Sequence, residues 1–147
     1  MNTLNQKIIS AWTKSNAIYA KAALTLGIGY PELMVLYALE TMGELKQKQI
    51  AENYGLQKQT VNTVIKTLAQ RELVRLVPSE ADKREKIVLL TQSGKAYARK
   101  LISPLRQIEE KVYKNIGAER LQAMCETQEL FNLLLEKEIN EDLSHEP

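Results

Sequence analysis

The sequence predicts a mainly α-helical protein that carries one small β-hairpin. Apolar residues recur at helical spacing through most of the 147 residues, and short β-rich runs replace that spacing only in residues 73–91. Glycine and proline interrupt the helical pattern at several points, as expected at the ends of separate helices. The composition, with 44% hydrophobic and 26% charged residues, is typical of a folded globular domain.

Two helices are expected in the first third of the chain. Residues 4–25 carry a regular apolar stripe on one helical face. Pro31 suits the first turn of a second helix, about 31–42, because its missing N–H has no helical partner there. Gly43 is expected to end that helix.

A helix–turn–helix is expected next. A short helix at about 47–53 is followed by Gly55, which fits the left-handed conformation that ends many helices. A second helix is expected at about 57–71. Its apolar positions follow the i, i+3, i+4, i+7 rule and are Val61, Val64, Ile65 and Leu68.

The predicted hairpin and two further helices complete the chain. Residues 73–77 and 87–91 are β-rich, and the polar segment between them is typical of a hairpin loop. Thr91 can cap a long helix at 92–116, and a last helix is expected at about 118–140. Pro104 is expected to kink the long helix, because proline removes one backbone hydrogen bond.

The order of these elements predicts a winged helix–turn–helix flanked by additional helices. The flanking helices carry more apolar surface than one small core can bury, notably Trp12 and the leucines at 133–135. The surplus predicts an identical partner chain in a two-fold homodimer.

Charge is distributed unevenly along the chain. Residues 46–100 hold 12 Lys and Arg against 5 Asp and Glu, a net charge of +7. Residues 1–45 are neutral overall, and residues 101–147 carry −5. A basic middle segment of this kind indicates contact with a polyanion.

Few groups in the sequence suit catalysis or metal binding. The single cysteine, Cys125, cannot form an internal disulfide or a cysteine zinc cluster, and the single histidine, His145, lies in a polar tail. Adjacent carboxylates such as Glu109 and Glu110 point in different directions on a helix. We expect no enzymatic activity, no cofactor and no metal site.

The sequence also argues against a membrane location. No stretch approaches the roughly 20 apolar residues that span a bilayer, and the N-terminal residues lack the apolar block of a signal peptide. A single cysteine suits the reducing cytoplasm, which is the expected location.

The second helix of the turn motif presents side chains suited to DNA. It has no acidic residue between Gly55 and Gln70, whereas a plain surface helix would more often pair Glu with Lys. Asn and Gln can bond adenine, and Thr can touch the thymine methyl group. The candidate contacts on this helix are Gln57, Lys58, Gln59, Thr60, Asn62, Thr63 and Lys66.

The tip of the hairpin is a second candidate contact. Arg84 on this loop could enter a narrow minor groove, and Asp82 could orient it by a charge-assisted bond. A polar turn in which Asp82 satisfies backbone N–H groups is an equally good interpretation from spacing alone. The basic residues expected to reach phosphates or grooves are Lys58, Lys66, Arg75, Lys83, Arg84 and Lys86.

Residues 31–95 resemble the MarR-type transcriptional regulators. The matching motifs are Gln49-Ile50-Ala51, Lys58-Gln59-Thr60-Val61-Asn62, Leu73-Val74-Arg75, Asp82-Lys83-Arg84 and Leu90-Thr91-Gln92-Ser93-Gly94. The resemblance implies a dimeric winged-helix repressor or activator, with its dimer interface in the first and the last two helices. It also implies that Arg84 enters the minor groove and that residues 57–63 read the major groove.

The chain departs from the family pattern at three positions. Gln57 replaces the usual Ser or Thr cap of the recognition helix, Lys46 replaces a capping Thr, and Glu72 stands where a Gly is usual. Gln57 is a poorer cap, and Glu72 is expected to adopt a strained positive φ angle.

The resemblance further implies a small-molecule effector bound between the DNA-binding part and the dimer helices. The candidate wall residues are aromatic, although packing is the preferred interpretation, and they are Trp12, Tyr19, Tyr30 and Tyr37. Family members that sense peroxide place a reactive cysteine near the first helix, where this chain has none. Cys125 is therefore interpreted as a small interface residue.

Together these features predict a sequence-specific DNA-binding regulator, expected to be a repressor, acting as a homodimer on a pseudo-palindromic operator. The expected division is a dimerisation helix in residues 1–30, a winged helix–turn–helix DNA-binding domain in 31–91, and dimerisation helices with a frayed tail in 92–147. The alternative is a winged-helix module that binds protein without sequence-specific DNA recognition.

Overall fold

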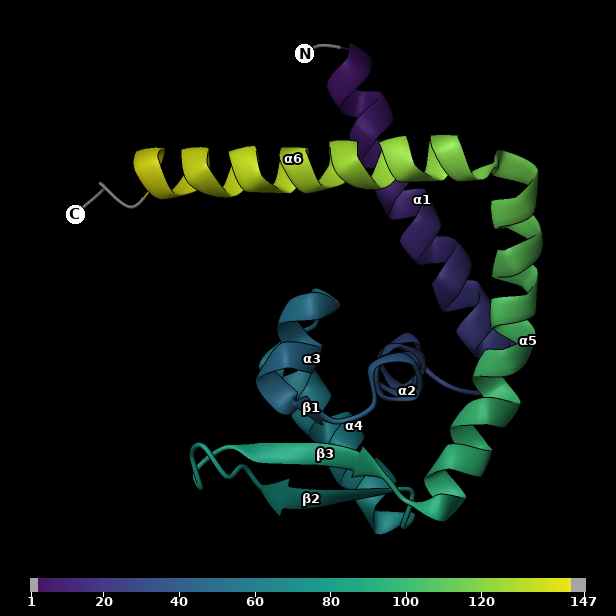
Figure 1. Ribbon diagram of the computed structural model, residues 1–147, viewed down its shortest axis with the longest axis vertical. Coiled ribbons are helices and arrows are strands. Elements are labelled where there is room, and N and C mark those ends of the chain that lie inside the picture. Colours follow the sequence, from purple (N-terminus) through teal and green to yellow (C-terminus); the bar gives the residue numbers. More distant parts are fainter. Residues whose placement is uncertain (1–2, 144–147) are drawn as a thin grey trace. The chain divides into compact units, whose positions relative to one another are not determined.

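The computed structural model describes residues 3–143 of the chain (Figure 1). The chain divides into two compact units, residues 1–104 and 105–147, and the division falls inside a long helix just after Pro104. His145 and most of the tail expected to fray lie outside the described residues. The predicted three-part functional division stays a prediction.

The chain is mostly helical, with one small sheet, as predicted. In chain order the elements are α1 (Thr3–Thr25), α2 (Tyr30–Met42), β1 (Leu45–Lys46), α3 (Gln47–Asn53), α4 (Lys58–Gln70), β2 (Val74–Pro78), β3 (Lys86–Leu90), α5 (Gln92–Ile116) and α6 (Ala118–Asp142). Every predicted helix is present, and each predicted strand is shifted by one residue. The kink expected at Pro104 stays a prediction.

The sheet has three antiparallel strands in the order β1-β3-β2. Strands β2 and β3 form the predicted hairpin, with Leu76 opposite Val88, and they end in a projecting loop (Figure 1). The expectation of two strands was incomplete, because β1 adds a third through Leu45, also opposite Val88. A two-residue strand is too short to show an alternating pattern in the sequence.

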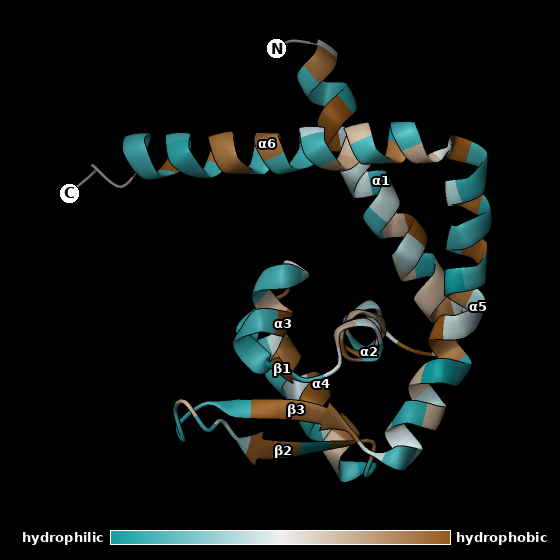
Figure 2. Ribbon diagram, in the orientation of Figure 1, coloured by the Kyte–Doolittle hydropathy of each residue, from teal (hydrophilic) through white to brown (hydrophobic). Residues whose placement is uncertain are grey.

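We call residues 30–104 the lobe. Its apolar core lies between α2, α3, α4 and the sheet. Hydrophobic residues gather on β2 and β3, and hydrophilic ones on the loop between them (Figure 2). Val64, expected on the apolar face of α4, is only half-buried. The largest fully buried apolar side chains are Leu33, Val35, Leu36, Ile50, Val61, Ile65, Leu68, Val88 and Ile102.

The junction between α4, β2 and α5 is tightly packed. The Thr91 hydroxyl accepts a hydrogen bond from Gly94 N–H (3.0 Å) and donates one to the Glu72 carbonyl (2.7 Å), so Thr91 caps α5 as predicted. A Cβ at Gly94 would lie 1.8 Å from the Leu73 carbonyl oxygen. Glu72 has a φ of 56°, which confirms the predicted positive φ angle.

In the second unit, α6 has no buried residue along its 25 residues. It exposes a series of large apolar side chains to solvent in this single chain. They are Met124, Leu130, Leu133, Leu134, Leu135 and Ile139.

Within residues 3–143, no single helix has the length and apolar composition of a membrane span. Helices α1 and α2 meet the length and composition test only when taken together, and they are bent by 93° at the break between them.

Candidate nucleic-acid interface

We call the β2–β3 hairpin with its loop, residues 74–90, the wing. A basic groove of about 650 Å³ lies between the start of α3, one side of α4 and the wing. Among the described residues that line it, six are cationic and one is acidic. The full lining is Lys46, Gln47, Lys48, Lys58, Asn62, Ile65, Lys66, Leu76, Arg84, Glu85 and Lys86. Clustered cations beside hydrogen-bonding side chains suit the backbone and base edges of a nucleic acid.

Helix α4 supplies one wall of the groove through Lys58, Asn62 and Lys66. Their spacing of four residues places them on one helical side. Val61, Ile65 and Leu68 are buried in the core and hold the helix in place. Local capping contributes little to α4, because its N-cap Gln57 makes no side-chain capping bond, as predicted.

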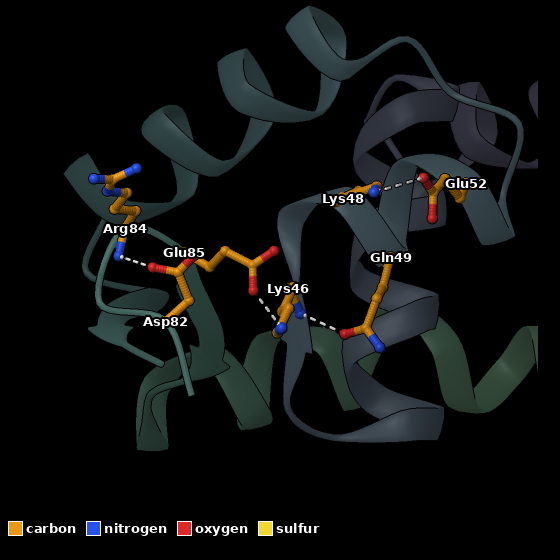
Figure 3. A network of polar contacts seen from close by, with 7 residues as sticks. All are labelled: Lys46, Lys48, Gln49, Glu52, Asp82, Arg84 and Glu85. Atoms are coloured by element: carbon orange, nitrogen blue, oxygen red, sulfur yellow. Dashed lines mark hydrogen bonds and ion pairs between the residues drawn. The ribbon is translucent and has the colours of Figure 1, made fainter. Parts of the chain in front are cut away.

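The wing loop, residues 79–85, is ordered by its own backbone. Arg84 N–H donates to the Asp82 carboxylate (2.9 Å), and Glu85 N–H donates to the Asp82 carbonyl (2.9 Å). Ser79 N–H closes the loop onto the Glu85 carbonyl (2.9 Å). Asp82 therefore has the turn-forming contact that the sequence left open, made to the backbone of Arg84, as Figure 3 shows.

The predicted DNA contacts do not share a single surface. Lys58, Asn62, Lys66, Arg84 and Lys86 line the groove. A second hollow of about 380 Å³ lies on the other side of α4, and the remaining candidates of that helix line it together with Gly29, Pro31, Glu32 and Val64. Those candidates are Gln57, Gln59, Thr60 and Thr63.

Three predicted residues line neither hollow. Arg75 is exposed on β2 next to Leu76, which faces the groove, and successive residues of a strand point to opposite faces. Asp82 and Lys83 are exposed in the wing loop. Their assignment as DNA contacts stays a prediction.

The contribution of α3 and its N-cap to the groove was not predicted from the sequence. Lys46, Gln47 and Lys48 line the groove. The two lysines belong to the basic segment 46–100, but no motif there distinguishes them from its other cations. Lys46 is the N-cap of α3, and its N–H donates to Gln49 Oε1 (2.9 Å). Lysine has no side-chain acceptor, so the Lys46 side chain cannot cap an N–H of α3 as a Thr would. The capping hydrogen bond at this position is the one that Gln49 Oε1 accepts from Lys46 N–H.

The C-terminal end of α4 is attached to α2 and α5 by a polar cluster. Arg71 Nη1 lies 3.1 Å from Glu32 Oε1, and the Tyr97 hydroxyl donates to the same oxygen (3.0 Å). The guanidinium also lies 4.7 Å from the centre of the Tyr97 ring. The contacts with Tyr97 and then with Glu32 raise the pKa of Arg71 against the lowering effect of burial.

The aromatic effector candidates lie away from both hollows. Trp12 is 37% exposed on α1, whereas Tyr19, Tyr30 and Tyr37 are half-buried on α1 and α2. None of the four lines either hollow described above, and their role in effector binding stays a prediction. Cys125 is exposed on α6.

Comparison with known proteins gives one consistent match. Residues 26–85 match the MarR family. A MarR family regulator from Neisseria meningitidis of known structure is 32% identical to this chain, with a TM-score of 0.85 over 97% of this chain and 99% of that one. The transcriptional repressor NicR of Pseudomonas putida is 31% identical over 100 residues, 68% of this chain. The transcriptional regulator SarZ of Staphylococcus aureus is 28% identical over 113 residues, 77% of this chain and 74% of SarZ.

The match to NicR spans 63% of that repressor, slightly less than two thirds of its length. The match to the N. meningitidis regulator has no such gap, because it extends over nearly the whole of both chains.

Proposed function

Because this chain belongs to the MarR family of transcriptional regulators, we propose that it is a repressor that binds a pseudo-palindromic DNA operator as a homodimer. Repression is the activity in the name of its relative NicR. The MarR family consists of regulators rather than enzymes, and the chain is not an enzyme.

The observation that carries the proposal is the basic groove between α4 and the wing. Lys58, Asn62 and Lys66 of α4 face it from one side, and Arg84 and Lys86 of the wing face it from the other. A helix docked in the major groove reads bases with residues near its N-terminus, and Asn62 has the amide that bonds adenine. The lysines and Arg84 then contact phosphates or the adjacent minor groove.

The same groove argues against the alternative of a protein-binding module. Six cations around one carboxylate form a surface suited to a regular polyanion. The α4 helix adds no acidic residue to that surface. Sequence-specific DNA binding therefore has the stronger support.

Support for the homodimer comes from α6. Its large apolar side chains are exposed in the single chain, and exposed apolar patches of this kind mark protein interfaces. A two-fold dimer would present two α4 helices to successive major grooves, with half-site centres about 34–36 Å apart.

The proposal extends to control of DNA binding by a small-molecule effector. A small molecule that favours a dimer with a different separation of its two α4 helices would release DNA by population shift. The aromatic side chains of α1 and α2 remain the candidates for such a site, with packing as the preferred interpretation.

The first test is selection of bound duplexes from a random pool, which should yield an inverted repeat with half-sites one helical turn apart. Arg84→Ala should then weaken binding to the selected operator by about tenfold, with a shallower salt dependence. Lys100→Ala is the control, because Lys100 is an exposed cation of α5 that lines neither hollow. A pool without enrichment, or equal affinities for Arg84→Ala and wild type, would contradict the proposal.

A further inference from the structure

Glu85 is the single carboxylate among the described residues that line the basic groove. Its Oε2 accepts a hydrogen bond from Lys46 Nζ, and the two side chains form an ion pair. Figure 3 shows the Glu85 side chain leaving the wing and pointing toward Lys46 at the start of α3. A carboxylate among six cations in the proposed DNA-binding groove needs a physical explanation.

The Lys46–Glu85 pair connects two parts of the groove that are far apart in sequence. Glu85 closes the wing loop through its backbone bonds to Ser79 and Asp82, and Arg84 is its neighbour. Lys46 lies in β1, opposite Ile87 of β3, and also begins α3. The pair therefore holds the base of the wing against the helix–turn–helix.

The pair is reachable from solvent, with 34% of the Lys46 side chain and 37% of the Glu85 side chain exposed. A phosphate approaching the groove would meet the carboxylate together with the cation. Neutralisation by Glu85 thus removes Lys46 from the cations available to DNA, and this loss applies to every sequence equally.

We propose that Glu85 is a specificity-determining residue, which keeps Lys46 off the DNA backbone and positions the wing that carries Arg84. It lowers affinity for DNA of any sequence, and it preserves the geometry needed at the operator. This inference rests on the proposed function and extends it to a residue that makes no favourable DNA contact of its own.

A purely structural role is the competing explanation. A carboxylate near the N-terminus of a helix is favourable, so Glu85 could serve only to stabilise α3 and the wing. In that case Glu85→Gln changes the affinity for every duplex alike and leaves the ratio of operator to random-duplex affinity unchanged. The specificity role predicts a fall in this ratio, which separates the two explanations.

The experiment measures the affinity of the full-length chain for a random-sequence duplex over a series of NaCl concentrations. Glu85→Gln should strengthen binding about fivefold and make the slope of log K against log salt steeper by about 0.9, the value of one phosphate contact. Lys46→Gln should weaken binding and make the slope shallower, because Glu85 is then uncompensated. The double variant should return to within about twofold of wild type.

A neighbouring ion pair of α3 provides the matched control. Lys48 lines the groove, and its Nζ lies 3.7 Å from Glu52, with both side chains more than half exposed. Such an exposed pair is weak, so Glu52→Gln should leave the salt slope within about 0.3 of wild type.

The second measurement is the ratio of operator to random-duplex affinity. Glu85→Gln should lower this ratio about threefold, because the freed Lys46 strengthens both complexes equally, whereas only the operator complex loses the positioned wing. A ratio at or above the wild-type value would overturn the proposal, as would weakened random-duplex binding by both single variants. Failure of the wild type to bind any duplex would contradict the proposed function itself, and this inference with it.

Discussion

Helices α4 and α6 differ in where their apolar side chains lie. Helix α4 buries Val61, Ile65 and Leu68 completely in the lobe and presents polar groups outward. Helix α6 is almost twice as long, buries no residue, and exposes leucines such as Leu134 and Leu135. A helix is stabilised mainly by packing of its apolar face, so α4 is held by the lobe, whereas the proposed homodimer would supply the packing for the apolar side chains of α6.

The largest effect is expected from disturbing the packing at the C-terminal end of α4. Gly94→Ala places a Cβ 1.8 Å from the Leu73 carbonyl oxygen, so the α5–β2 junction must move. We expect the free energy of unfolding to fall by about 3 kcal/mol, at the upper end of overpacking effects. Urea unfolding followed by circular dichroism measures this loss.

Gly29→Ala is the matched control for that substitution. Gly29 has an ordinary φ of −80°, and a Cβ there would come no closer than 3.7 Å to Pro31. We expect a change within about 0.5 kcal/mol, typical of a tolerated surface substitution. Equal unfolding free energies for the two variants would show that the close packing at Gly94 is not needed by the lobe.

The second prediction addresses α6. Leu134→Glu combined with Leu135→Glu places two carboxylates on its exposed apolar surface. We expect the dimer dissociation constant to rise about 100-fold, equivalent to about 2.7 kcal/mol, because charge is excluded from the core of an interface. Sedimentation velocity over a concentration series measures the change, and operator affinity should fall with it.

Glu136→Gln combined with Lys137→Gln is the control for α6, since it alters the next two residues of the same helix without touching an apolar side chain. This variant should dimerise like the wild type. The lobe of the leucine variant should keep its core, because its fully buried residues come from other elements. Unaltered dimerisation of the leucine variant would place the interface elsewhere.

Much of the fold could be predicted because its signals are local. The periodic spacing of Val61, Ile65 and Leu68 is enough to orient α4, and Thr91 followed by Gly94 marks the start of α5. Strand β1 could not be predicted in the same way, because Leu45 pairs with Val88. That pairing is long-range and leaves no pattern in a two-residue segment.

In the candidate site, too, local contacts could be predicted from the sequence and long-range contacts could not. Lys58, Asn62 and Lys66 share one side of α4 by helical geometry alone, so sequence reasoning could propose them. The ion pair between Lys46 and Glu85 joins residues 39 positions apart, and no spacing rule indicates it. The face occupied by Arg75 also depends on strand register, which the sequence did not specify.

The smallest expected effect concerns the cluster that fixes the end of α4. Tyr97→Phe removes the hydroxyl that donates to Glu32 (3.0 Å) and leaves the ring beneath Arg71. We expect the free energy of unfolding to fall by about 1 kcal/mol, the usual net value of one hydrogen bond. Tyr54→Phe, at the end of α3 and outside this cluster, should change it less in the same urea titration. If the two variants are equally stable, the Tyr97 hydroxyl contributes nothing measurable, and the Arg71–Glu32 pair and the apolar core hold the end of α4 without it.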